Sequence, residues 1–130
     1  MQNTADPMAK YYKVGGTLFE VNKYIEAIER YTHAVEWDQE FSSAYFNRSL
    51  AFALLRLYSP AANDAQIVLR LEPESHDAMF VLGLLCEYQH DNDGAVMWYK
   101  MSLSVDPDYV PAMVRLRELE AITAGASKSY

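Results

Sequence analysis

Three histidines and one cysteine are the side chains of this sequence best suited to nucleophilic, acid–base or metal chemistry. His33, His76 and His90 stand far apart, and no His-x-x-Glu-His or similar spacing places two ligands on one helical face. Cys86 lies in an apolar segment with no cationic neighbour that would activate it, so we expect an inert thiol. The sequence therefore predicts no catalytic residue, no metal ligand and no cofactor.

Two short motifs resemble ligand-binding loops only in part. Gly15-Gly16 lacks the spacing of a phosphate loop and the Lys-Ser or Lys-Thr that ends one. Asp91-Asn92-Asp93-Gly94 is rich in acceptor oxygens, but no Glu follows at the distance that a calcium loop requires. Close helix packing accounts for the first motif and a helix start for the second. We therefore predict a protein that is not an enzyme.

Composition narrows the choice of partners and compartment. The 130 residues carry 18 acidic and 11 basic side chains, a net charge of -7. This balance disfavours nucleic acid and anionic membrane surfaces as partners, because both bind basic faces. No apolar run reaches the roughly 18 residues of a membrane span. The start of the chain lacks the pattern of a signal peptide. A single cysteine fits a reducing compartment, so we predict a cytoplasmic protein.

The sequence repeats with a period of 34 residues. Small residues share columns in successive units, where two helices must approach closely, and acidic residues close each unit. The clearest columns are Ala27, Ala61 and Ala95; Gly15, Ser49 and Gly83; Tyr31, Ala65 and Tyr99; Ala34, Val68 and Ser102; Tyr11, Tyr45, Met79 and Met113; and Asp38, Glu72 and Asp106. Pro73 and Pro107 follow two of the acidic residues and stop the preceding helices.

Between these columns, apolar residues recur at intervals of three and four, which is the helical period. The pattern predicts seven helices, at residues 8–21, 24–37, 42–55, 59–71, 76–89, 92–105 and 110–122. Ser59-Pro60 is typical of a cap followed by a first-turn proline, and residues 91–93 supply acceptors at the start of the sixth helix.

This pattern resembles the tetratricopeptide repeat (TPR) family over residues 8–122. The resemblance implies an all-α solenoid in which three helix-turn-helix repeats form a right-handed superhelical stack closed by a capping helix. The implied repeats are residues 8–41, 42–75 and 76–109, with the capping helix at 110–122. Residues 1–7 and 123–130 are then flexible tails.

The resemblance also implies that the first helix of each repeat lines a concave groove that binds a peptide or a helix. The expected partner-binding residues are Tyr12, Lys13, Phe19, Phe46, Asn47, Leu50, Leu54, Asp77, Phe80, Val81, Leu84, Tyr88 and Arg115. Most are apolar and suit an apolar or amphipathic segment of a protein. Asn47 offers both a donor and an acceptor to a ligand backbone.

TPR domains of co-chaperones grip the acidic tails of heat-shock chaperones with a carboxylate clamp of two lysines, two asparagines and an arginine. At the matching positions this chain has Tyr12, Gly16, Asn47, Asp77 and Val81. One of the five residues agrees, and Asp77 reverses a charge. We therefore expect clamp binding of chaperone tails to be absent.

The sequence thus favours a non-enzymatic scaffold or adaptor that binds a partner in an apolar groove. Two alternatives remain open. The first is a co-chaperone or a secretion-type chaperone that binds client segments. The second is a homo-oligomerising domain or the targeting domain of a larger enzyme.

Overall fold

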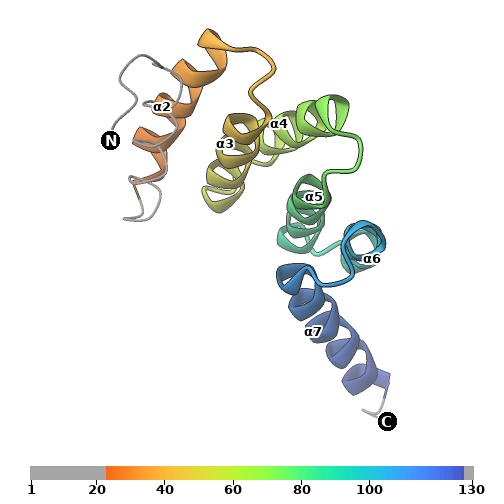
Figure 1. Cartoon of the computed structure of the whole chain (residues 1–130). Coiled ribbons are helices and arrows are strands. Elements are labelled where there is room, and N and C mark those ends of the chain that lie inside the picture. The colour runs from red at the N-terminus through yellow and green to blue at the C-terminus, as the bar shows by residue number, and fades with distance from the viewer. Residues whose placement is uncertain (1–22, 128–130) are drawn as a thin grey trace, which may run out of the picture. The chain divides into compact units, whose positions relative to one another are not determined.

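The computed structural model describes residues 23–127, and all regular structure in this range is α-helical (Figure 1). The helices are α2 (Tyr24–Trp37), α3 (Ser42–Leu54), α4 (Tyr58–Leu71), α5 (His76–Tyr88), α6 (Asn92–Val105) and α7 (Val110–Ser127). The predicted helix at 8–21 lies outside the described residues, together with Tyr12, Lys13 and Phe19.

The chain divides into two compact units at Pro73. In unit 1, α3 packs against both α2 and α4; in unit 2, α6 packs against both α5 and α7. Within the part that the structure describes, no helix has the length and hydropathy needed to cross a membrane. The same residues contain no group of three or more His, Cys, Asp or Glu placed to hold a metal ion.

The 34-residue columns form the cores of the two units. Ala27, Ala61 and Ala95 are fully buried, and Tyr31, Ala65 and Tyr99 are at most 1% exposed. In the columns that contain Ala34 and Tyr45, the residues that lie in α2 to α6 are also buried. Small side chains recur there because each site faces a neighbouring helix at short range. Gly83 gives one cause directly, since a Cβ atom at this position would overlap the ring of Tyr99.

A left-handed residue ends the first helix of the second and third repeats. Arg56 and His90 both have φ of 63°, and they are 34 residues apart. The backbone amide of the next residue donates a hydrogen bond to a carbonyl oxygen in the last turn of the helix. Leu57 donates to Phe52 at 2.9 Å, and Asp91 donates to Cys86 at 2.8 Å. This Schellman-type ending reverses the chain so that the next helix returns along the first.

Helix starts and ends agree with the sequence prediction to within one residue, except at the end of α7. Ser59 is not a cap, because α4 begins at Tyr58 with Leu57 as its N-cap, and Pro60 lies within the first turn. The last helix continues to Ser127 and not to 122. No proline follows residue 122, and Ala121, Ala124 and Ala126 favour the helix, so nothing in the chain ends it there. Asp91 does cap α6, accepting a hydrogen bond from the Gly94 amide at 3.0 Å.

Candidate partner-binding surface

An uncharged face runs along α3 in unit 1. Phe46, Leu50 and Leu54 recur every four residues and so share one side of the helix. Phe46 and Leu50 are half-buried, and Leu54 is 36% exposed. Asn47 lies beside them and donates a hydrogen bond from Nδ2 to the Ser43 carbonyl oxygen, 2.8 Å away. We call these four residues the α3 face.

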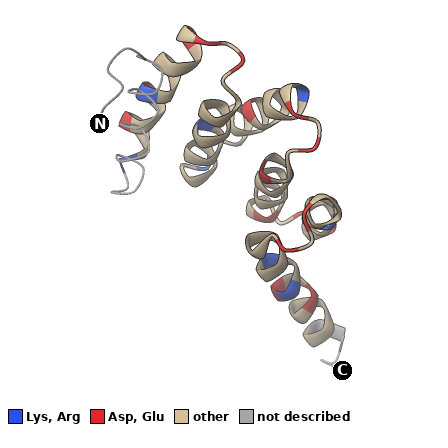
Figure 2. Cartoon of the chain, in the orientation of Figure 1, with Lys and Arg blue, Asp and Glu red and all other residues tan. Residues whose placement is uncertain are grey.

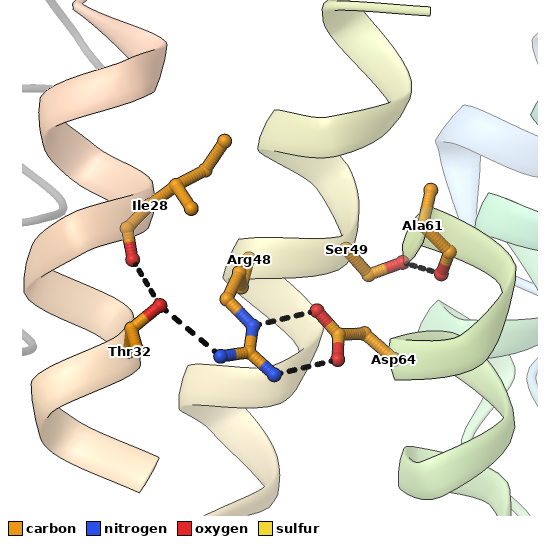
Figure 3. A network of polar contacts seen from close by, with 6 residues as sticks. All are labelled: Ile28, Thr32, Arg48, Ser49, Ala61 and Asp64. Atoms are coloured by element: carbon orange, nitrogen blue, oxygen red, sulfur yellow. Dashed lines mark hydrogen bonds and ion pairs between the residues drawn. The ribbon is translucent and has the colours of Figure 1, made fainter. Parts of the chain in front are cut away.

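Another side of α3 is held to its neighbours by Arg48, the only charged residue of the helix (Figure 3). Its guanidinium donates from Nε and Nη2 to the two oxygens of Asp64 on α4, at 2.7 and 2.8 Å. A third bond runs from Nη1 to Thr32 Oγ1 on α2, at 3.1 Å. The hydrogen bond to Asp64 raises the pKa of Arg48, against the opposing effect of burial. Arg48 is thus structural, and the α3 face itself is left without charge.

In unit 2 the structure corrects one predicted binding residue, since Val81 is fully buried and its side chain offers no surface to a partner. Phe80, also expected to line the groove, is half-buried. Its ring packs against those of Tyr99 and Tyr109, each with centroids 5.7 Å from its own, and so against the core cluster of this unit. Leu84 and Tyr88 are half-buried on the same helix.

The two charged residues predicted for the binding site in unit 2 are both engaged within the unit. Asp77 lies 3.7 Å from His76 Nε2 and accepts a hydrogen bond from Tyr109, although 45% of its side chain is exposed. Burial, followed by this hydrogen bond, raises the pKa of Tyr109. Arg115, which the sequence analysis assigned to partner binding, is already paired with Glu87 and Glu118.

The potentially reactive histidine and cysteine side chains are dispersed over both units. His33 pairs with Glu36 at 3.6 Å on the exposed side of α2. His76 lies 3.6 Å from Asp106 and edge-on to Tyr109. Cys86 is half-buried, and burial with the neighbouring charge of Asp91 raises the pKa of its thiol. A raised pKa leaves the thiol protonated and unreactive at neutral pH.

Acidic residues gather in the loops between helices (Figure 2). Each of the three four-residue loops, at 38–41, 72–75 and 106–109, carries two acidic side chains and no basic one. These loops therefore hold six acidic side chains, whereas the α3 face holds none.

The polar network of unit 2 is centred on Glu87, a residue to which the sequence analysis gave no role. Glu87 of α5 accepts hydrogen bonds from Tyr99 of α6 and from Arg115 of α7. Its partners stand 12 and 28 residues further along the chain, so no local spacing pairs them. One signal was present, because Glu87 is an acidic residue that follows the apolar run from Ala78 to Cys86 in the same helix.

No family model matches the sequence. Curated proteins do match it. The chain is 32% identical over 107 residues to heat shock protein STI1 of Saccharomyces cerevisiae, covering 82% of this chain and 18% of that protein. It is 25% identical over 120 residues to DnaJ homolog subfamily C member 7 of Homo sapiens, covering 92% of this chain and 24% of that protein. The chain thus spans about a quarter or less of these relatives.

Solved structures show the same fold. The first TPR domain of human RPAP3 aligns with a TM-score of 0.83 at 24% identity, over 96% of this chain and all of that one. The first TPR of Spaghetti (RPAP3), bound to the HSP90 peptide SRMEEVD, aligns with a TM-score of 0.80 at 23% identity, over 90% of this chain and 93% of that one. The six described helices, the 34-residue columns of their cores and these likenesses agree: the chain is a tetratricopeptide-repeat domain.

Proposed function

We propose that this chain is a non-enzymatic adaptor that binds an apolar or amphipathic segment of a partner protein through the α3 face. The observation that carries the proposal is the division of α3 into two sides. On one side, Arg48 bonds α3 to the neighbouring helix. On the other side, Phe46, Leu50 and Leu54 form an apolar row that is partly exposed. Apolar side chains held at helical spacing on a rigid element are a common way to bind a segment of another protein.

Other predicted binding residues stay in the proposal. Asn47, within the α3 face, has an amide of the kind that can hydrogen-bond a ligand backbone. In unit 2, Leu84 and Tyr88 are half-buried on α5. Tyr12, Lys13 and Phe19 stay in the proposal on the sequence pattern alone. The acidic loops and the net charge of -7 disfavour nucleic acid and anionic membranes as partners. A reducing, cytoplasmic setting is part of the same proposal and rests on the lone Cys86.

A second candidate function is the binding of an acidic C-terminal segment. It is favoured by the Spaghetti structure, which is bound to SRMEEVD, and by the relative STI1, a heat shock protein. In this chain Asn47 agrees with the clamp, whereas Asp77 would repel a ligand carboxylate and the buried Val81 offers no cation. We therefore rank it second.

Random-peptide display on the intact chain separates these candidates. The first predicts selected peptides with apolar residues at spacings of three to four, and binding that changes little with salt. The second predicts peptides that end in several carboxylates, and binding that weakens steeply as salt rises. Failure to select any peptide, with the protein folded by circular dichroism, would contradict both.

Two further possibilities carry their own tests. Because the chain spans about a quarter or less of its relatives, it fits a targeting or client-binding domain of a longer protein. Self-association would appear in light scattering as a mass that rises with concentration. A constant monomer mass would leave the α3 face to a different protein.

A further inference from the structure

The carboxylate of Glu87 lies in a site built by two other helices of unit 2. Tyr99 of α6 donates its hydroxyl to Oε1 at 2.7 Å. Arg115 of α7 donates from Nε to Oε1 at 2.9 Å and from Nη2 to Oε2 at 2.5 Å. These donors bind both carboxylate oxygens side-on, which is the geometry in which guanidinium recognises a carboxylate most strongly. The helix α5 contributes only the carboxylate itself.

The donors of this site have further contacts besides Glu87 that hold them in place. Tyr99 is fully buried, and its ring packs against Phe80. Arg115 is also bound by Glu118 of its own helix, from Nη1 to Oε2 at 2.7 Å. Loss of the Glu87 carboxylate would leave a tyrosine hydroxyl and a guanidinium aimed at the same empty position. The Arg115 side chain is 37% exposed and that of Glu87 is 12% exposed, so the site borders solvent.

The electrostatics of the site favour the ionised form of the Glu87 carboxylate. Burial alone would raise the pKa of Glu87, but the hydrogen bonds from Arg115 and Tyr99 outweigh it and lower the pKa below its ordinary value of 4.5. Burial and the hydrogen bond to Glu87 raise the pKa of Tyr99, which keeps its hydroxyl a donor. Arg115 is paired with two carboxylates, those of Glu87 and Glu118. The three side chains together therefore carry a net negative charge.

We propose that Arg115 and Tyr99 form a carboxylate-binding site that the chain fills with its own Glu87, and that Glu87 is therefore a specificity-determining residue that turns acidic segments away. The inference rests on the proposed function. It explains why a TPR domain with an arginine in its capping helix would bind an apolar segment and not an acidic one. An incoming carboxylate finds Arg115 already neutralised and meets the charge of Glu87 and Glu118.

The experiment replaces Glu87 by Ala and supplies a carboxylate from solution. Acetate is compared with chloride at equal ionic strength, and the melting temperature of the intact chain is measured. We expect acetate to stabilise Glu87→Ala specifically and to leave the wild type unchanged. Glu118→Ala is the matched control: it removes one carboxylate from the same Arg115 but leaves the site filled, so it should not respond to acetate. If Glu87→Ala is unfolded in chloride, acetate should restore its folding.

A second readout measures specificity. Labelled SRMEEVD peptide should bind Glu87→Ala at least about tenfold more tightly than the wild type, since a charge-assisted hydrogen-bond pair becomes available to it. The added substitution Arg115→Met should abolish this gain. The inference is overturned if acetate fails to stabilise or refold Glu87→Ala, if Glu118→Ala responds equally, if the gain survives Arg115→Met, or if the wild type binds the peptide as tightly as Glu87→Ala.

Failure of the proposed function and failure of this inference give different results. If display on the wild type yields no apolar peptide while Glu87→Ala still responds to acetate, the proposed function fails and the carboxylate site stands. The reverse result would leave the α3 face as a binding surface and remove Glu87 from its specificity.

Discussion

At the scale of residues, the pair of Arg48 and Asp64 ties three helices of unit 1 together. The side chains are 16% and 2% exposed, and two hydrogen bonds join them. Thr32 extends the network to α2, since its hydroxyl accepts from Arg48 and donates to the Ile28 carbonyl oxygen at 2.7 Å. A buried charge that loses its partner is far more costly than the pair is stabilising.

We therefore expect Arg48→Ala to lower the free energy of unfolding by about 3–5 kcal/mol, because it strands the Asp64 carboxylate in the core. The double variant Arg48→Met, Asp64→Leu should recover most of the loss. Urea denaturation followed by circular dichroism measures both. A double variant as unstable as the single one would show that the network holds the fold by more than charge pairing.

Gly83 is the residue whose size the packing restricts most clearly. A Cβ atom there would lie 2.7 Å from Tyr99 Cδ1 and closer still to Cε1, and Tyr99 is fixed by burial and by Glu87. We expect Gly83→Ala to cost about 1–3 kcal/mol from overpacking. Gly125→Ala is the control, because nothing lies within 4 Å of its Cβ and alanine favours the helix. Equal melting temperatures for the two variants would argue against this packing.

The lowered pKa of Glu87 predicts a dependence on acid. A carboxyl whose pKa is lower in the folded than in the unfolded chain stabilises the fold above its ordinary value, here 4.5, and loses this effect as the pH falls through the folded value. The difference in melting temperature between the wild type and Glu87→Gln should therefore be full at pH 6 and shrink as the pH falls below 4.5. A difference that stays constant down to pH 2.5 would contradict the assigned hydrogen bonds.

At the scale of elements, the 34-residue period predicted the helices well because each column is a packing requirement. The last helix was predicted too short because its end is decided by the absence of a stop signal. The sites were predicted less well. Val81 and Phe80 occupy inner positions of the repeat, but Val81 is buried and Phe80 packs against the core cluster of unit 2. Arg115 is paired with Glu87. These contacts join residues far apart in the chain, which helical spacing cannot reveal.

The turn that ends α5 provides a test at this scale. His90 has φ of 63°, a conformation that costs a side-chain-bearing residue about 1 kcal/mol and that glycine adopts freely. We expect His90→Gly to be neutral or to stabilise by up to about 1 kcal/mol. The neighbouring Gln89, with φ of -99°, gains nothing from glycine, so Gln89→Gly should destabilise by about that amount. Equal losses in thermal unfolding would refute the predicted role of the turn.

At the scale of the whole molecule, each of the three four-residue loops carries two acidic side chains, and the arginine of α3 and one arginine of α7 are bound by carboxylates of their own unit. What α3 leaves for a partner is a short row of apolar side chains with one amide. This division favours a ligand recognised by shape and apolar area over one recognised by charge.

The most direct test of this account is the affinity of a display-selected peptide for Leu54→Glu, with Ile25→Glu as the matched control. Both residues belong to unit 1 and are exposed, Leu54 by 36% and Ile25 by 75%, so a carboxylate at either needs no burial. We expect Leu54→Glu to weaken binding by about tenfold or more, a loss typical of an interface anchor, with the helical content unchanged. Ile25→Glu should bind as the wild type does. Unchanged affinity for Leu54→Glu, or an equal loss in both variants, would contradict the assignment of the α3 face as the partner-binding surface.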